Sequence, residues 1–168
     1  MAQNKNVSFA HPSKYRLVFP FFEFMTGNER AESVVINCSE VKLPGVTMTP
    51  EKVGTPYHDM RIVSPNVQWG DLQVTYHVDE LYENYEILWS WFMYMKDPER
   101  LGMHNTEGMV DASIMIYSNN DNPRFRWNLK NIFPVSFGEL LYTKKATDAD
   151  DLEQAVVFSM DYFSLERL

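Results

Sequence analysis

The chain has 168 residues, of which 45% are hydrophobic and 14% aromatic, and this content argues against a disordered protein. Its formal net charge of -8 argues against a protein that reads nucleic-acid sequence, because such a protein needs a basic surface to neutralise phosphates. The length predicts a single domain, residues 1–168, with room for a sizeable core.

Two segments near the N-terminus, residues 15–24 and 33–40, are rich in strand formers. The turn-forming residues 26–30 separate them, so we expect the two strands to form a hairpin. Residues 1–13 are polar, do not have the pattern of a signal peptide, and are expected to be flexible.

A long irregular stretch, residues 41–66, contains four prolines and two glycines. A connection of this length is uncommon in a compact domain unless it has a function. Short β-prone pieces at residues 46–48 and 60–63 predict a projecting arm. From the residues alone, this arm either folds over its own domain or reaches another chain.

Residues 72–78 alternate between apolar and polar side chains, which predicts a strand with one buried face. A helix over about residues 80–96 is expected directly after it, with Asp79 as its N-cap and Asp97–Pro98 as its stop. The expected core stripe of the helix consists of Leu81, Tyr85, Leu88, Phe92 and Met95. Large apolar groups outside this stripe, at Trp89, Trp91, Met93 and Tyr94, predict cover on more than one side.

The C-terminal half predicts further strands at residues 111–117, 124–130, 132–142 and 152–165, with turns or loops at 118–123 and 143–151. The segment 132–142 is expected to bend at Pro134 and Gly138. We therefore predict an α+β, mainly β, domain of strongly bent antiparallel sheets, forming a sandwich or partial barrel with one flanking helix.

Few residues carry the chemistry of an enzyme or a metal site. Cys38 is the single cysteine, the four histidines are scattered, and no nucleophile or phosphate-binding motif occurs. His58 and Asp59 are adjacent on an extended segment, so their side chains point to opposite faces. The acidic cluster Asp148, Asp150, Asp151 and Glu153 lacks the frame of a calcium loop and is expected to be a solvated loop. We expect no catalysis, no cofactor and no membrane partner.

The order of the elements resembles the tail-tube family of contractile-tailed bacteriophages, whose relatives include the Hcp ring of type VI secretion. The matching pieces are KYRLVF at 14–19, CSEVKLPG at 38–45, GDLQVTYHVDE at 70–80 with the helix that follows, FPVSFGEL at 133–140 and SMDYF at 159–163. The resemblance implies a hexameric ring that stacks into a tail tube and forms a channel for DNA. It also implies that the arm docks on the adjacent ring.

The resemblance implies two sets of contact residues. The first set is the inter-ring arm: Leu43, Val46, Met48, Val53, Tyr57, Met60 and Ile62. The second set is an interface or core on the helix: Trp89, Trp91, Phe92, Met93 and Tyr94. The implied partners are further copies of the chain, a tail sheath protein, baseplate or neck proteins, and genomic DNA that passes without sequence-specific binding. The implied location is the virion tail, assembled in the host cytoplasm.

Three alternatives stay open. Residues 97–110 look longer than the link expected in a repeating tube protein, and the same fold also serves as a tail-completion (terminator) ring or a baseplate tube initiator. A secretion tube like Hcp is a second alternative. The third, from another class, is a monomeric ligand-binding β-barrel with the helix as a lid and a pocket lined by Trp89 and Phe92.

Overall fold

The computed structural model describes residues 10–19, 38–63, 65–96, 108–143 and 151–168. The strands are β1 (Tyr15–Val18), β2 (Cys38–Lys42), β3 (Val46–Met48), β4 (Glu51–Gly54), β5 (Asp59–Ile62), β6 (Val67–Trp69), β7 (Leu72–His77), β8 (Val110–Tyr117), β9 (Pro123–Phe137), β10 (Glu153–Ser159) and β11 (Tyr162–Arg167). The described helix is α2 (Glu83–Met95). The predicted α+β, mainly β, fold class is confirmed.

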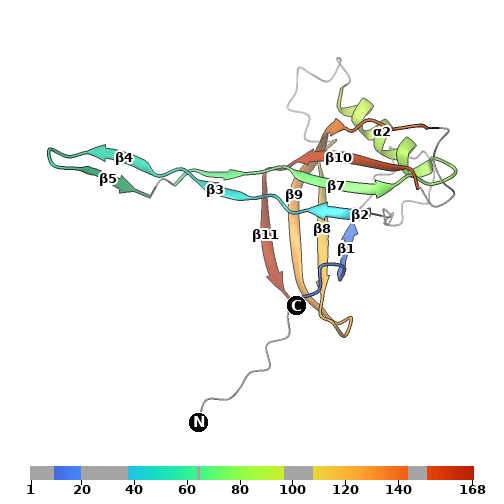
Figure 1. The fold of residues 1–168 in the computed structure, drawn as a ribbon, viewed down its shortest axis with the longest axis horizontal. Coiled ribbons are helices and arrows are strands. Elements are labelled where there is room, and N and C mark those ends of the chain that lie inside the picture. Colours follow the sequence, from blue (N-terminus) through green and yellow to red (C-terminus); the bar gives the residue numbers. More distant parts are fainter. Residues whose placement is uncertain (1–9, 20–37, 64, 97–107, 144–150) are drawn as a thin grey trace, which may run out of the picture.

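One bent antiparallel sheet forms the body of the molecule, in the order β1-β8-β9-β10-β7-β2, with β11 also paired to β9 (Figure 1). Strand β9 is 15 residues long and joins the two halves of the sheet. Its first half pairs with β8 and β11, whereas its second half pairs with β10. The sheet is therefore strongly bent and not closed, with α2 covering one side of it.

The bend in β9 is fixed by hydrogen bonds at Asn131, whose φ of 54° is left-handed. Its backbone N–H donates to Asp111 Oδ1 at 3.2 Å, and its side-chain amide donates to Asp161 Oδ2 at 2.5 Å. Lys130 also donates to the Asp111 carboxylate. These contacts tie β8, β9 and the β10–β11 junction together at one corner.

The core lies between the bent sheet and α2. The predicted alternation on β7 is confirmed, because Leu72, Val74 and Tyr76 are fully buried while the residues between them are half-buried. The other buried apolar side chains are Leu17, Phe19, Leu88, Trp91, Val110, Ala112, Ile114, Leu129, Ile132, Val156, Phe158 and Met160. Tyr76 donates a 2.6 Å hydrogen bond to the buried Gln154, so this polar group is satisfied within the core.

The helix begins later than predicted, at Glu83, and its N-cap is Tyr82 with no side-chain capping bond, so the predicted Asp79 cap is wrong. The side chain of Asn84 organises this junction instead. It accepts from the backbone N–H of Asp79 at 3.1 Å and donates to the His77 carbonyl at 2.9 Å. Leu81 precedes the helix and is 74% exposed, so it does not contribute to the core stripe.

The predicted hairpin of the first two strands is also wrong for the described residues. Strand β1 pairs with β8 and β2 pairs with β7, which places them at opposite ends of the strand order. Most of the two predicted segments, residues 20–37, lies outside the described residues, as do residues 1–9.

The strands of the C-terminal half differ in number from the prediction. The two strands expected at 124–130 and 132–142 are the single bent strand β9, which ends at Phe137. The last predicted strand is divided into β10 and β11, and Asp161 donates its N–H to the Lys130 carbonyl at the break. Pro134 lies in the half of β9 that pairs with β10 alone, beside a register shift between Val157 and Phe158, and at such a position a proline does not end the strand.

Candidate assembly surfaces

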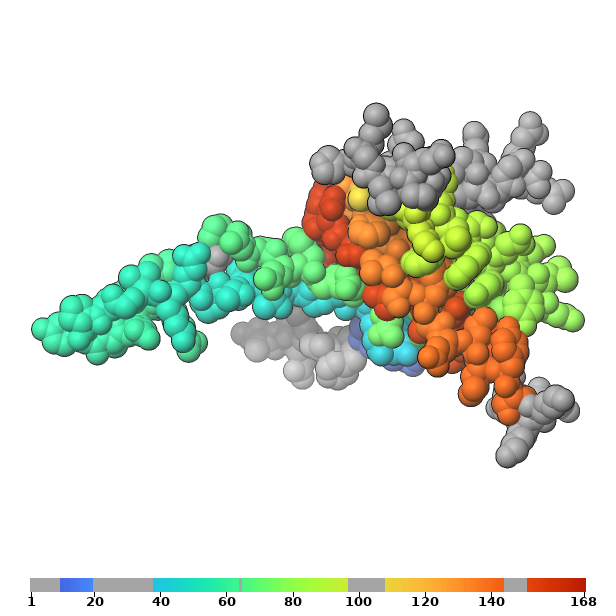
Figure 2. All heavy atoms as spheres, turned by 90° about the horizontal axis from the view of Figure 1, so that it is seen from above, coloured from blue at the N-terminus to red at the C-terminus, as the bar shows by residue number. Residues whose placement is uncertain are grey.

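Residues 46–69 form a two-stranded ribbon that projects far from the body (Figures 1 and 2). Strand β3 pairs with β6 near the body, and β4 pairs with β5 toward the tip. A turn at residues 55–58 closes the tip, where the His58 N–H donates to Thr55 Oγ1 at 3.2 Å. We call residues 46–69 the arm and residues 51–62 its tip hairpin.

The register gives each of the two pieces of the arm, β3–β6 and β4–β5, two faces, because directly opposed residues share a face. In β3–β6 one face pairs Val46 with Trp69 and Met48 with Val67, and the other pairs Thr47 with Gln68. In β4–β5 one face pairs Val53 with Met60 and Glu51 with Ile62, and the other pairs Lys52 with Arg61 and Gly54 with Asp59. Each piece thus has one largely apolar face and one polar face.

All seven residues predicted for the arm contact are exposed, by between 42% and 95% of their side-chain and backbone surface. Five of them lie on the apolar faces of the two pieces: Val46 and Met48 in β3–β6, and Val53, Met60 and Ile62 in β4–β5. An isolated two-stranded ribbon cannot bury such a face on its own. Their role as a contact surface stays a prediction, and their exposure makes them available for one.

The base of the arm is held close to the body by two kinds of contact. Gly70 donates its N–H to the Gly45 carbonyl at 3.0 Å, and a Cβ at position 70 would lie 3.2 Å from that oxygen. The Trp69 ring packs on Phe163, with centroids 4.8 Å apart, and Phe163 packs on Trp127 at 5.1 Å. The arm therefore leaves the body in a defined direction.

The helix residues predicted as interface or core fall into two groups. Trp91 is 2% exposed, and its indole N–H donates to the Gly108 carbonyl at 2.8 Å, so it belongs to the core. Phe92 and Tyr94 are half-buried, whereas Trp89 and Met93 are each 43% exposed. Trp89 and Phe92 both pack on Phe137 of β9, with centroids 6.0 and 5.2 Å away. Their packing on β9 does not support a ligand pocket under the helix.

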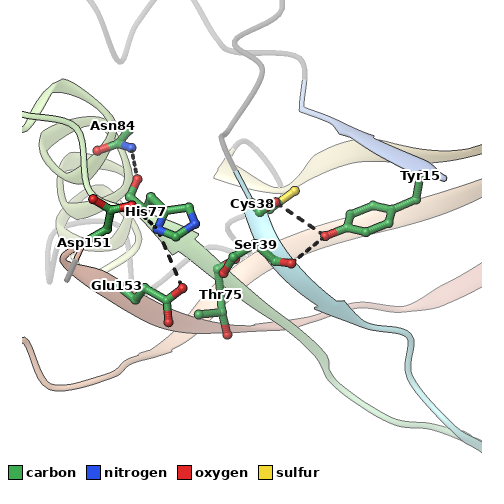
Figure 3. A network of polar contacts seen from close by, with 8 residues as sticks. All are labelled: Tyr15, Cys38, Ser39, Thr75, His77, Asn84, Asp151 and Glu153. Carbon is green, nitrogen blue, oxygen red and sulfur yellow. Dashed lines mark hydrogen bonds and ion pairs between the residues drawn. The ribbon is translucent and has the colours of Figure 1, made fainter. Parts of the chain in front are cut away.

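The two ends of the strand order meet at one point, which Figure 3 shows from close by. The Tyr15 hydroxyl of β1 donates to the Ser39 carbonyl of β2 at 3.1 Å and lies 3.4 Å from the Cys38 carbonyl. In the described residues, β1, β2 and β11 each pair with another strand on one side only. Among the described residues these three strands thus have an unpaired edge, and in other proteins such edges are places where a second chain adds.

The same region contains a hollow of about 520 Å³, lined by Cys38, His77, Val78, Asp79, Glu80, Asp151 and Leu152. His77 Nδ1 lies 3.6 Å from Glu153 Oε1 and 3.9 Å from Asp151 Oδ2, beyond hydrogen-bonding distance (Figure 3). Burial raises the pKa of the Cys38 thiol, which disfavours the thiolate form.

Within the described residues, no group of three or more His, Cys, Asp or Glu side chains is placed to hold a metal ion. Two of the four acids considered for calcium, Asp148 and Asp150, lie outside the described residues. No helix in the described part of the chain is long and apolar enough to cross a bilayer. His58 lies at the exposed tip of the arm, beside the turn that Thr55 closes.

The fold is that of tail-tube and Hcp-like proteins, which confirms the predicted resemblance at the level of structure. No protein-family model and no curated protein matches the sequence. Two of the similar solved structures are a tube-terminating cap of the anti-feeding prophage and a sheath/tube terminator of an extracellular contractile injection system, PVC. The cap has a TM-score of 0.70 at 11% identity over 100% of both chains. The PVC terminator has a TM-score of 0.67 at 13% identity, over 95% of this chain and 99% of that chain.

A third similar structure is the Hcp1 protein from E. coli EAEC 042, with a TM-score of 0.51 at 10% identity, covering 92% of this chain and 99% of that chain. The three proteins are thus two components of contractile injection systems and one Hcp protein.

Two features of these surfaces were not identified from the sequence. Tyr15 was assigned only to a strand, although its hydroxyl joins the two ends of the sheet. Trp69 precedes the β7 strand and was not singled out, although it anchors the arm on Phe163. A lone tryptophan next to Gly70 at the end of an irregular segment was the available signal for this anchor.

Proposed function

We propose that this chain is a structural subunit of a contractile tail, which forms hexameric rings that stack into a tube and acts without catalysis. The tube would form the channel through which genomic DNA passes, and the chain would reside in the virion tail after assembly in the host cytoplasm. Its partners would be further copies of itself, a sheath protein, and baseplate or neck proteins. The observation that carries the proposal is the arm, whose apolar face is exposed and lies away from the body.

Two other observations support assembly. The open edges of β1, β2 and β11 offer backbone groups to a neighbouring sheet, and ring closure removes such edges. The fold is shared with a terminating cap, a sheath/tube terminator and an Hcp protein. The net charge of -8 fits a channel that a polyanion passes without being retained.

The second candidate is a terminator ring that caps the tube. The similarity to a tube-terminating cap over the full length of both chains favours this candidate. A repeating subunit stacks without limit, whereas a terminator stops after one or two layers. An Hcp-like secretion tube is supported by the same fold and differs in its genomic neighbours, which would include a secretion ATPase instead of head genes.

Sedimentation velocity and negative-stain microscopy of the purified full chain test the proposal. We expect sixfold rings, with long tubes for a repeating subunit and isolated or paired rings for a terminator. A stable monomer at high protein concentration would overturn the proposal.

A pair of variants tests the role of the arm in this assembly. The double variant Val53→Ser with Met60→Ser removes an opposed pair from the apolar face and should leave rings intact while reducing stacking. The control, Thr47→Ala with Gln68→Ala, changes an opposed pair on the polar face and should stack as the wild type does. Equal stacking by both variants would remove the arm from the proposal.

A further inference from the structure

Strands β1 and β2 are the two ends of the main sheet, and in the described residues each pairs on one side only, β1 with β8 and β2 with β7. The Tyr15 hydroxyl of β1 reaches across to β2, where it donates to the Ser39 carbonyl at 3.1 Å and lies 3.4 Å from the Cys38 carbonyl (Figure 3). Among the described residues, no backbone ladder joins these two strands. We call residues 15–17 and 38–40 the seam, because side chains close the sheet there.

The β2 side of the seam contains a β-bulge. The register with β7 shifts between Cys38 and Glu40, so Ser39 is an extra residue with no opposed residue on β7. The Ser39 hydroxyl holds the bulge by donating to the Thr75 carbonyl at 3.3 Å, while the Ser39 carbonyl accepts from Tyr15. Tyr15 therefore occupies a backbone acceptor on the edge of β2 that a strand of another chain would otherwise use.

The β1 side of the seam contributes a backbone donor. Burial raises the pKa of the Cys38 thiol, and hydrogen bonds from the Cys38 backbone, the Tyr15 side chain and the Leu17 backbone partly oppose this rise. The Leu17 N–H thus points toward β2 and away from β8, since successive N–H groups of a strand point to alternate sides. An edge donor of β1 and an edge acceptor of β2 are therefore both bonded to side chains of the seam.

The seam is the weakest connection in the described part of the sheet. Tyr15, Cys38 and Val41 are partly buried and pack against the core, so apolar contacts bring the two strands together. The polar link between them consists of a few side-chain hydrogen bonds, whereas β7 with β10 and β8 with β9 are joined by backbone ladders. A neutral hydrogen bond shifts an equilibrium by about three- to tenfold. Opening the seam therefore costs fewer hydrogen bonds than separating those strands.

We propose that the Tyr15 hydroxyl is an autoinhibitory latch, which keeps the edges of β1 and β2 closed against each other in the single subunit. A strand of another chain reaches either edge only after the bond to Ser39 has broken. The latch itself is a property of one subunit, whereas its role in assembly rests on the proposed function. The edge of β11 is not part of the seam, so the latch acts on two of the three edges that are unpaired among the described residues.

Hydrogen–deuterium exchange of the full chain tests the latch. Tyr15→Phe removes the hydroxyl oxygen and keeps the ring against the core. We expect peptides of residues 15–18 and 38–42 to exchange about three- to tenfold faster in this variant, while β8 and β9 exchange at the wild-type rate. Tyr117→Phe on β8 is the matched control, because the Tyr117 hydroxyl contacts the Met115 sulfur at 3.6 Å and lies outside the seam. Unchanged exchange at the seam, or equal acceleration of every strand, would overturn the latch.

Sedimentation velocity over a range of protein concentrations tests what the latch restrains. If another chain must displace Tyr15 from Ser39, removal of the hydroxyl increases the fraction of subunits that can associate. Tyr15→Phe should therefore assemble at about a three- to tenfold lower concentration than the wild type, whereas Tyr117→Phe should assemble as the wild type does. An equal or higher concentration for Tyr15→Phe would overturn the inhibitory role and leave the proposed function standing. A monomer at every concentration, for the wild type and both variants, would overturn the proposed function, and the exchange experiment would still decide on the latch.

Discussion

Trp69 at the base of the arm packs edge to face against Phe163 of the last strand, with ring centroids 4.8 Å apart and ring planes at 70°. Phe163 also meets Trp127 of β9 at 5.1 Å. The arm is thus fixed to the sheet by side chains as well as by the chain itself. An arm with a fixed direction loses less conformational freedom when it docks than a free loop would lose.

The first prediction concerns this anchor. Phe163→Ala removes two aromatic contacts and should lower the free energy of unfolding by about 2 kcal/mol. Leu165→Ala on the same strand is the control; because Leu165 is half exposed, its loss should be about 0.5 kcal/mol. Urea unfolding followed by tryptophan fluorescence measures both changes. Equal losses in the two variants would show that the aromatic contacts do not anchor the arm.

A second prediction follows from the close approach of β9 and β10 at Gly138. Its N–H donates to the Ala155 carbonyl at 2.7 Å, and an added Cβ would lie 2.9 Å from that backbone oxygen. Gly138→Ala should therefore destabilise the protein by about 2 kcal/mol, because the backbone must move to relieve the clash. Gly54→Ala is the matched control, since a Cβ there has no atom within 4 Å. Thermal unfolding should show a lower Tm for the first variant alone.

The strand β7 and the arm were the parts of the fold that the sequence predicted best. The alternation of apolar and polar residues over 72–78 directly predicts which side chains are buried, since every second side chain of a half-buried strand is apolar. The arm followed from prolines and glycines that leave short β-prone pieces between them. Both signals are local, so they do not depend on which strands become neighbours.

The errors arose where tertiary contacts decide the outcome. Proximity in sequence favoured a hairpin of the first two strands, but β1 and β2 pair with β8 and β7, which are distant in sequence. Asp79 is a good capping residue, yet Asn84 bonds back to the end of β7, and the helix starts at Glu83. The helical stripe was displaced accordingly, with Trp91 buried in place of Leu81.

The third prediction separates the two tryptophans of the helix that the sequence treated alike. Trp91→Phe removes buried surface and the 2.8 Å hydrogen bond to the Gly108 carbonyl, so we expect a loss of about 2 kcal/mol. Trp89→Phe keeps an aromatic ring at a partly exposed position and should cost under about 1 kcal/mol. Guanidinium unfolding of both variants decides the matter, and a larger loss for Trp89 would contradict the assignment of Trp91 to the core.

The last prediction concerns the corner at Asn131, where Lys130 pairs with Asp111. Burial opposes ionisation of Asp111, but hydrogen bonds from Lys130 and from the Asn131 N–H outweigh it and hold the pKa of this carboxyl below its ordinary 3.8. The same pairing raises the pKa of Lys130 above 10.5. The ionised Asp111 therefore stabilises the fold fully at any pH above the pKa that this carboxyl has in the unfolded chain. The stabilisation is lost as the pH falls through the lower pKa that it has in the folded protein. The Lys130 contribution is complete below 10.5 and lost as pH rises through its folded value.

Asp111→Asn should flatten the loss of stability in acid, because the variant has no carboxylate to protonate at the corner. At pH 7 the variant should already have a Tm lower by about 2 °C, since the neutral amide leaves Lys130 without its ion pair. Asp71→Asn changes an exposed carboxylate at the start of β7 and serves as the control. Thermal unfolding from pH 2 to pH 7 measures the Tm of the wild type and of the two variants as a function of pH. Parallel curves for the wild type and Asp111→Asn would show that the corner does not contribute to acid sensitivity.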